Sequence, residues 1–339
     1  MKKEIKPRSK VCVHNGPFHA DEVFSVAVMS IIQPKIEVTR SREEKVWKAS
    51  DFRVDVGGKY DPETGDFDHH QLGFAERHPA PTARYEIGPK KSSIGLVWEH
   101  YGEDAIRKIL PAYDKELDDE GIQFIYSQIT RTLIAPIDAA DNGEAKDFYM
   151  DSGAYRSPSI INLIQNLNPT WMEKECSADL SFMDAVHFAI NYLSREIVRN
   201  ISVYSGRFKL LEQVKSVDSS GILVLEEFVP WAPIFNKYPE ETKDIKIVIF
   251  PSNGIQMVQS PYYNWRTDAG RFSEYTVDGK KRKQRYPAPS AICGATNDVL
   301  VNLTKVEDAV FVHASGFIGA AKSVEGAKKL AQYIIDNQE

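Results

Sequence analysis

The sequence contains few cysteines, no long apolar run and no excess of positive charge. Only three of its 339 residues are cysteines, and they stand far apart at Cys12, Cys176 and Cys293. Such an odd and scattered set forms neither a disulfide framework nor a zinc-finger spacing, so we expect a reducing, intracellular setting. The cytoplasm is the compartment we predict, with nuclear or organellar targeting left open.

No apolar segment approaches the roughly 20 residues that a membrane-spanning helix needs. The basic N-terminal stretch MKKEIKPRSK is followed by no signal-like apolar core, so we expect neither a secretion signal nor a membrane partner. The formal net charge is −6, which argues against a protein that coats nucleic acid by bulk attraction. An enzyme that holds a few phosphates locally stays compatible with that charge.

Short apolar segments alternate with helical patterns in the first third of the chain. Residues 10–14, 36–40 and 51–56 have the composition of strands, and residues 21–33 have the apolar spacing of a helix. This order predicts an α/β protein whose N-terminal domain has a mainly parallel sheet flanked by helices. Strand-like segments return late in the chain and precede a final helix at 323–336, which predicts a smaller C-terminal α/β domain.

Potential metal ligands gather in four short segments. The first, HNGPFHADE at residues 14–22, places two histidines and an aspartate where a strand turns into a helix. By itself it is also compatible with a hydrogen-bonded turn in which Asp21 caps the helix. The second, VDVGG at residues 54–58, sets Asp55 between valines, where a buried charge is costly unless it is paired or metal-bound.

The third segment, DFDHHQ at residues 66–71, contains two adjacent histidines. Adjacent side chains point in different directions, so one histidine can bind a metal while the other reaches a substrate. A polar surface loop is the alternative. The fourth segment, IDAADNG at residues 137–143, ends an apolar helix and offers Asp138 or Asp141, although its Asn-Gly pair is also typical of a helix end.

Together the four segments indicate a more specific chemistry than any one of them alone. Mixed histidine and carboxylate ligands suit manganese, iron or zinc better than calcium, which prefers oxygen. One aspartate can bridge two cations about 3.5–4 Å apart, and such a pair holds the attacking and leaving oxygens of an in-line phosphoryl displacement. The sequence therefore predicts a two-metal phosphoesterase, a hydrolase with two divalent ions.

The order of these motifs resembles the melanocyte-proliferating-gene exonuclease family, which belongs to the DHH phosphoesterase superfamily. The superfamily is named for the triplet that stands here as Asp68-His69-His70, and the resemblance extends to FVHASGFIG at residues 311–319. It implies three parts along the chain. These are a DHH-type metal-binding catalytic domain at 1–175, a helical connection at 176–218 and a C-terminal substrate-binding domain at 219–339.

The resemblance also implies roles for single residues. One metal ion would be held by His14, His19 and Asp55. The other would be held by Asp21, Asp55, His69 and Asp141, with Asp55 as the bridge and therefore a catalytic residue. Asp138 competes with Asp141 for the last position, and Asp68 either binds a metal or orients a ligand. His70 would face the substrate phosphate, where it stabilises negative charge or donates a proton.

In this family pattern the C-terminal domain closes over the substrate. His313, Ser315 and Gly316 are the first candidates for contact with it, and the basic stretch KKRKQR at 280–285, with Lys281 and Arg282, is the second. That stretch is equally compatible with a solvated loop, and less so with a nuclear-targeting signal.

The ligand set predicts a metal-dependent phosphodiesterase, and the resemblance adds a manganese-dependent 3′–5′ exonuclease acting on single-stranded RNA. Two alternatives stay open. One is a phosphoesterase for short oligonucleotides or small nucleotide phosphates, and the other is a non-catalytic, metal-stabilised RNA-binding protein. The extra histidine at position 70, which a purely structural metal site does not need, favours an enzyme.

Overall fold

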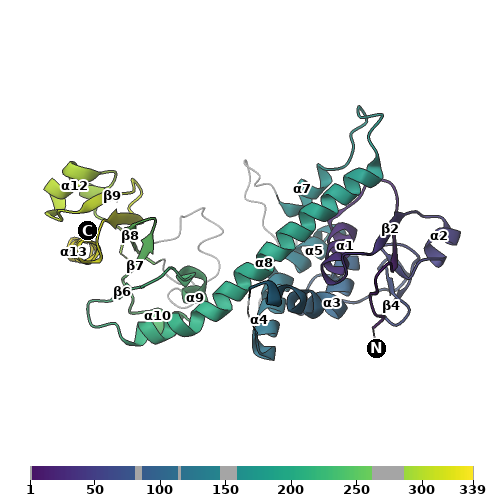
Figure 1. The fold of residues 1–339 in the computed structure, drawn as a ribbon, viewed down its shortest axis with the longest axis horizontal. Coiled ribbons are helices and arrows are strands. Elements are labelled where there is room, and N and C mark those ends of the chain that lie inside the picture. The colour runs from purple at the N-terminus through teal and green to yellow at the C-terminus, as the bar shows by residue number, and fades with distance from the viewer. Residues whose placement is uncertain (1, 81–85, 114–115, 146–158, 262–285, 339) are drawn as a thin grey trace. The chain divides into compact units, whose positions relative to one another are not determined.

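The computed structural model describes residues 2–80, 86–113, 116–145, 159–261 and 286–338 (Figure 1). The chain forms two compact units, Met1–Ile201 and Ser202–Glu339, and the long helix α8 (Ala178–Lys215) runs across the boundary between them. Each unit contains one five-stranded sheet with helices. The predicted α/β fold class, with a mainly parallel N-terminal sheet, is confirmed.

The strands of the first unit are β1 (Lys10–Val13), β2 (Glu37–Arg40), β3 (Phe52–Val54), β4 (Tyr60–Asp61) and β5 (Asp66–Phe67). Its helices are α1 (Ala20–Ile32), α2 (Glu44–Lys48), α3 (Ser93–Ile109), α4 (Asp119–Ile129), α5 (Ala135–Asp141), α7 (Ile160–Gln165) and the first part of α8. A 3₁₀ turn, η1 (Leu110–Tyr113), follows α3, and a π-helical turn, η2 (Thr130–Ile134), joins α4 to α5.

The first sheet has the strand order β2-β1-β3-β5-β4. Strands β2, β1, β3 and β5 are parallel, and only β4 runs antiparallel, beside β5. All three residues of β3 are buried, as are Val11 to Val13 of β1, because helices cover parallel strands on both faces. The carboxyl ends of β1, β3 and β5 consequently lie side by side at one edge of the sheet.

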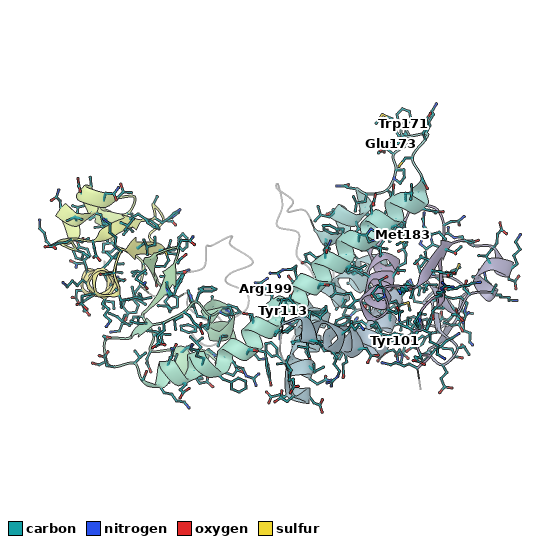
Figure 2. The ribbon with its side chains drawn as sticks, viewed as in Figure 1. Tyr101, Tyr113, Trp171, Glu173, Met183 and Arg199 are labelled. Atoms are coloured by element: carbon teal, nitrogen blue, oxygen red, sulfur yellow. The ribbon has the colours of Figure 1, made fainter. Side chains whose placement is uncertain are left out.

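Helix α1 lies in the middle of the first unit. Every residue from Ala20 to Met29 is buried, which is typical of a helix enclosed on all sides. It packs most extensively against α3, and α5 and α7 also contact it (Figure 1). On the sheet side, the ring of Tyr101 from α3, which Figure 2 labels, belongs to the core. It packs edge-on against Phe52 and Phe67. Helix α3 therefore contacts both α1 and the strands β3 and β5.

The strands of the second unit are β6 (Ile222–Val224), β7 (Ile247–Ser252), β8 (Ile255–Gln259), β9 (Ala309–Val312) and β10 (Ile318–Ala321). Its helical elements, after the end of α8, are α9 (Trp231–Lys237), α10 (Pro239–Thr242), η3 (Ser290–Ile292), α12 (Asn297–Thr304) and α13 (Val324–Asp336).

The second sheet has the order β6-β7-β8-β10-β9 and is antiparallel except for the β6–β7 pair. Its core joins Ile247 and Ile249 of β7 to Leu330 and Ile334 of α13. The apolar residues of α13 recur with the period of an amphipathic helix and face the sheet. The late strands and the final helix therefore form two packed layers around one core. Within the part of the chain that the structure describes, no helix is long and apolar enough to cross a lipid bilayer.

Candidate metal centre

The predicted ligands follow the carboxyl ends of neighbouring parallel strands. His14 comes directly after β1, Asp55 directly after β3, and the pair His69 and His70 follows β5 by one residue. Strands β1, β3 and β5 are adjacent in the sheet, so these side chains start from the same edge. Such an edge is where α/β proteins bind their ligands, because the loops there are free to carry polar groups.

The backbone at Asp55 bends sharply as it leaves the sheet. Asp55 has a φ of 55°, and Gly57 and Gly58 follow with φ of 102° and 65°. A left-handed conformation is costly for most residues, tolerated by aspartate and free for glycine. The bend stops β3 at Val54 and leaves the Asp55 carboxylate beside the ends of the neighbouring strands. Strain of this kind is typical of functional sites.

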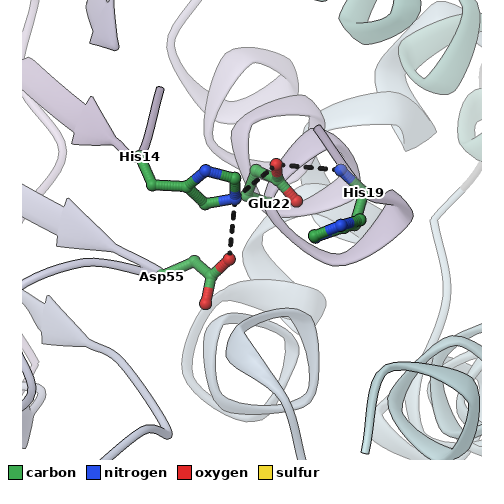
Figure 3. Close-up of side chains that lie close together, drawn as sticks. All are labelled: His14, His19, Glu22 and Asp55. Carbon is green, nitrogen blue, oxygen red and sulfur yellow. Dashed lines mark hydrogen bonds and ion pairs between the residues drawn. The ribbon is translucent and has the colours of Figure 1, made fainter. Parts of the chain in front are cut away.

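The first group of ligand atoms surrounds His14 (Figure 3). Its Nε2 lies 3.2 Å from Asp55 Oδ2 and 3.0 Å from Glu22 Oε1. Glu22 Oε1 also accepts the backbone N–H of His19 at 2.9 Å. Ligand atoms of His14, His19, Glu22 and Asp55 lie within 4.8 Å of one another, which is close enough to share one cation.

Two further groups adjoin the first and share members with it. His69 Nε2 lies 3.2 Å from Asp141 Oδ2 and 3.5 Å from Asp55 Oδ1. Ligand atoms of His19, Asp21 and Asp141 also lie within 4.8 Å of one another. Asp55 therefore contributes to both sides of the cluster, one oxygen toward His14 and the other toward His69. A carboxylate in that position is suited to bridge two cations.

Burial and charge shift the proton affinities of these groups in opposite directions. Burial disfavours the charged imidazoles, but the carboxylates of Asp55 and Glu22 outweigh it at His14 and raise its pKa to about 10. Asp141 and Asp55 likewise raise the pKa of His69 to about 10.

The carboxylates show the converse effect. The imidazoles of His14 and His69 overcome burial and hold the pKa of Asp55 well below its usual range. Asp21 has the opposite environment, because burial and the negative charges of Asp55 and Asp141 raise its pKa well above its usual range.

Several buried polar atoms of the cluster have no hydrogen-bond partner in the described part of the chain, and these atoms show whether divalent metal ions would fit the site. Both carboxylate oxygens of Asp21, one oxygen each of Glu22 and Asp55, and Nε2 of His69 are buried and have no hydrogen-bond partner among the described residues. A buried carboxylate without a partner is costly, and a bound cation satisfies it without protonation. The cluster combines nitrogen and oxygen donors, a set that fits Mn²⁺, Fe²⁺ or Zn²⁺.

Two of the predicted ligands, Asp68 and Asp138, lie outside these groups. Asp68 accepts N–H groups from Gly58 at 2.6 Å and His69 at 2.8 Å, and it binds His70 Nδ1 at 2.8 Å. Its oxygens are therefore occupied, and its geometry is that of a residue that orients the loop of His70.

Asp138 faces the start of α3 instead of the cluster. It accepts the hydroxyl of Ser92 at 2.7 Å and the N–H of Gly95 at 3.1 Å, and its second oxygen lies 2.5 Å from His78 Nε2. Of the two aspartates that the sequence left open, Asp141 is the one that the structure places beside His69.

His70 differs from His69 in its exposure. About two thirds of its side chain is open to solvent, and Nδ1 lies 2.8 Å from Asp68 and 3.3 Å from Asp55. The hydrogen bond to Asp68 raises the pKa of His70, which favours the protonated ring. With Nδ1 turned toward the carboxylates, Nε2 is left for a ligand.

Glu22 is the residue of the cluster that sequence reasoning missed. It stands in the first turn of α1, where an acidic residue is expected for its effect on the helix dipole. It is nevertheless fully buried and contacts His14. One feature of the sequence could have indicated its burial. Glu22 stands directly after Asp21 and directly before the apolar run VFSVAVM, which is typical of a buried helix.

The predicted substrate contacts of the second unit lie in the loop between β9 and β10. The N–H of Ser315 donates to His313 Nδ1 at 3.1 Å, and the N–H of Gly316 donates to the carbonyl of His313 at 2.8 Å. Gly316 has a φ of 69°, which favours glycine. The structure gathers these three residues in one tight turn. Lys281 and Arg282 lie outside the described residues.

Comparison with known proteins gives matches over almost the whole chain. The family model MYG1_exonuc, described as an uncharacterised protein family (UPF0160), matches residues 10–335. The MYG1 protein of Saccharomyces cerevisiae is 29% identical over 98% of this chain and 97% of its own length. The MYG1 protein of Dictyostelium discoideum is 30% identical, with coverages of 95% and 94%. A protein named MYG1 exonuclease in Homo sapiens is 25% identical, with coverages of 95% and 85%.

Among solved structures, the chain is similar to RecJ from Thermus thermophilus in complex with Mn²⁺. The sequence identity is 15% and the TM-score is 0.29. The match covers 98% of this chain and 53% of the other, so this chain spans about half the length of that RecJ chain. A score this low supports no argument about the site.

Proposed function

The chain belongs to the MYG1 exonuclease family, and from this premise we propose that it is a metal-dependent phosphodiesterase that removes nucleotides from the 3′ end of single-stranded RNA. The observation that carries the proposal is the set of buried oxygen and nitrogen atoms at the sheet edge that have no hydrogen-bond partner among the described residues. A binding module has no evident need for so many buried polar atoms without hydrogen-bond partners at one place. A hydrolase that uses two cations does.

We assign the two sides of the cluster to two divalent ions, with manganese as the proposed metal. His14, His19 and Asp55 would hold one ion, with Glu22 beside them. Asp21, Asp55, His69 and Asp141 would hold the other. When bound, such ions supply the Lewis acidity that in-line hydrolysis of a phosphodiester needs. The four segments that carry these ligands begin at the ends of β1, β3 and β5 or lie on α1 and α5, two helices that contact each other.

His70 acts on the substrate side of the cluster in this proposal. Asp68 fixes its Nδ1 at 2.8 Å and favours the protonated ring, so Nε2 can donate a proton to a phosphate oxygen or to the leaving group. Because Asp68 itself is held by backbone N–H groups, the orientation of His70 does not depend on the metals. A group of this kind contributes to turnover while contributing little to metal binding.

His313 is proposed as a substrate contact in the second unit. His313 Nδ1 lies 2.8 Å from the hydroxyl of Ser315 and 3.1 Å from its backbone N–H, and both groups can donate to an unprotonated Nδ1. In the neutral ring the remaining proton then stands on Nε2, where it can meet a phosphate or a ribose hydroxyl. Lys281 and Arg282 stay predictions from the sequence.

The test is a time course with 5′-labelled single-stranded RNA, in Mn²⁺ and in EDTA. We expect a metal-dependent ladder that shortens from the 3′ end, and we expect Asp55→Asn to abolish it. Asp184→Asn is the matched control, because Asp184 is an exposed carboxylate of α8 in the same unit and belongs to none of the three groups of ligand atoms. A single-stranded DNA of the same sequence measures the preference for ribose.

Two outcomes would replace the proposal. Rapid cleavage of dinucleotides with an intact 20-nucleotide RNA would make the protein a phosphoesterase for short oligonucleotides or small nucleotide phosphates. RNA binding without products under Mn²⁺, Mg²⁺ or Zn²⁺ would make it a non-catalytic, metal-stabilised RNA-binding protein.

A further inference from the structure

Two arginines stand at the carboxyl end of β2, next to the strand end that carries His14. The side chain of Arg40 is buried, and both of its Nη atoms have partners. Only 2% of its side chain is exposed, it pairs with Asp179 at 3.1 Å and donates to the carbonyl of Gly16, and its guanidinium lies 5.0 Å from the ring of Phe182. These contacts make Arg40 a structural residue that holds α8 and the loop after β1 together.

Arg42, two residues further on, has a different environment. It is exposed, and its guanidinium lies against the loop after β1, where Nη1 donates to the carbonyl of Asn15 and Nη2 is 3.1 Å from His14 Nδ1. No carboxylate of the described residues forms an ion pair with it. Arg42 is therefore a free positive charge that touches a residue of the metal cluster.

The direction of the contact between Arg42 Nη2 and His14 Nδ1 depends on the tautomer of His14. His14 turns Nε2 toward Asp55 and Glu22, and its Nδ1 faces the carbonyl of Asn15 at 3.0 Å. A histidine that binds a metal through Nε2 carries its proton on Nδ1, and the carbonyl of Asn15 lies where it could accept that proton. Arginine has donors only. A guanidinium has five N–H donors, so the exposed fork of Arg42 has donors for a further acceptor beside its contacts with Asn15 and His14.

The acceptor that fits is an anion placed over the cluster. Arginine presents a planar fork of donors that matches two oxygens of a phosphate. Once divalent ions compensate the buried carboxylates, an exposed guanidinium at the rim of the site attracts the negative charge of a substrate. We propose that Arg42 binds a phosphate of the nucleic-acid substrate beside the metal centre, an inference that rests on the proposed exonuclease function.

The test combines equilibrium binding with cleavage. A fluorescein-labelled single-stranded RNA is titrated with wild-type protein and with Arg42→Ala and Arg42→Lys, with Ca²⁺ in place of Mn²⁺, and gels check that the RNA stays intact. Lys35→Ala is the matched control. Lys35 is an exposed cation two residues before β2, at the opposite end of the strand that Arg42 follows, so both variants remove one positive charge.

We expect Arg42→Ala to weaken binding about tenfold at low salt, as for the loss of one charge-assisted hydrogen-bonded contact. The slope of log K against log salt should become shallower by about 0.7, the value for one phosphate contact on a single strand. Arg42→Lys should keep the slope and recover part of the affinity, and Lys35→Ala should leave both quantities within about twofold of wild type. In cleavage assays Arg42→Ala should raise KM more than it lowers kcat.

Two results would overturn the inference. If the Arg42→Ala variant binds RNA with the same affinity and salt dependence as the Lys35→Ala variant, Arg42 contacts no phosphate. Arg42→Ala that loses Mn²⁺ affinity, measured by metal titration without RNA, would show that Arg42 acts on His14 instead. Binding is measured without turnover, so a wild-type protein that binds RNA but never cleaves it refutes the exonuclease proposal alone. A wild-type protein that binds no RNA refutes both.

Discussion

Replacing Asp21 by asparagine should affect the metal-free and the metal-loaded protein in opposite ways. Asp21 is fully buried, and neither of its carboxylate oxygens has a hydrogen-bond partner among the described residues. Burial and the charges of Asp55 and Asp141 raise its pKa. A raised carboxyl pKa means that the native state holds the proton more tightly than the unfolded chain. The stability of the metal-free protein therefore falls as pH rises above the unfolded value toward the native one. Asparagine removes this cost.

The expected size follows from two opposing effects. Relief of an unpaired buried carboxylate contributes about 2 kcal/mol. Loss of a negative charge from the first turn of α1 costs about 0.3–1 kcal/mol. The difference of about 1.5 kcal/mol should raise the melting temperature of the first unit by about 3–6 °C in EDTA, since a domain of this size gains about 2–4 °C per kcal/mol. With Mn²⁺ at about 100 times its Kd, wild type should gain about 2.7 kcal/mol, and Asp21→Asn much less.

The assay is thermal unfolding of both proteins in EDTA and in Mn²⁺ at pH 7, with Asp184→Asn as the control. The order of melting temperatures should reverse between the two conditions. A variant that melts below wild type in EDTA would refute the reasoning, because it would mean that Asp21 has a stabilising partner in the metal-free protein. Equal Mn²⁺ stabilisation of both proteins would refute its role as a ligand.

Three other predictions concern the same site. Since His14 and His69 have pKa values raised to about 10 in the metal-free protein, both are charged at pH 7. Mn²⁺ must then displace protons from the two histidines, so the affinity of the protein for Mn²⁺ should rise with pH up to about 10. Calorimetry in two buffers of different ionisation enthalpy counts the protons that are released. His70→Ala should keep Mn²⁺ content within about twofold and lower kcat at least a hundredfold, on the order of a general acid; loss of metal would reject its substrate-side role. Asp138→Ala should lower the free energy of unfolding by about 3 kcal/mol in urea titration, because it leaves buried His78 unpaired; an unchanged midpoint would contradict this.

The choice between Asp138 and Asp141 shows where sequence reasoning stops. The two residues are three positions apart, so on an α-helix they share one side and spacing gives no preference. The π-helical turn η2 directly before α5 adds a residue to one turn and shifts the helical phase of α5. Propensities and apolar spacing do not predict such a turn. It arises where α5 packs between α1 and α3, and that packing directs Asp138 to α3 and Asp141 to His69.

Glu22 and Arg42 were hidden for a different reason. Both are ordinary at the level of sequence, an acidic residue in the first turn of a helix and a cation in a loop. Glu22 becomes part of the cluster because α1 is enclosed on all sides, which buries its first turn against His14. Arg42 becomes a candidate phosphate contact because β2 lies beside β1 in the sheet order, which no local pattern specifies.

The sequence by itself determined the donor atoms that the candidate site offers and predicted the sheet edge at which they lie. Short strands that each end in histidine or aspartate place those groups at the carboxyl edge of a parallel sheet, because parallel strands start and finish together. The tertiary structure decided which carboxylates face the cluster and which brace it, as for Asp68 and Asp138. Ligand identity follows from residue type, whereas the direction of a side chain depends on strand order, helix phase and burial, which exist only once distant segments pack together.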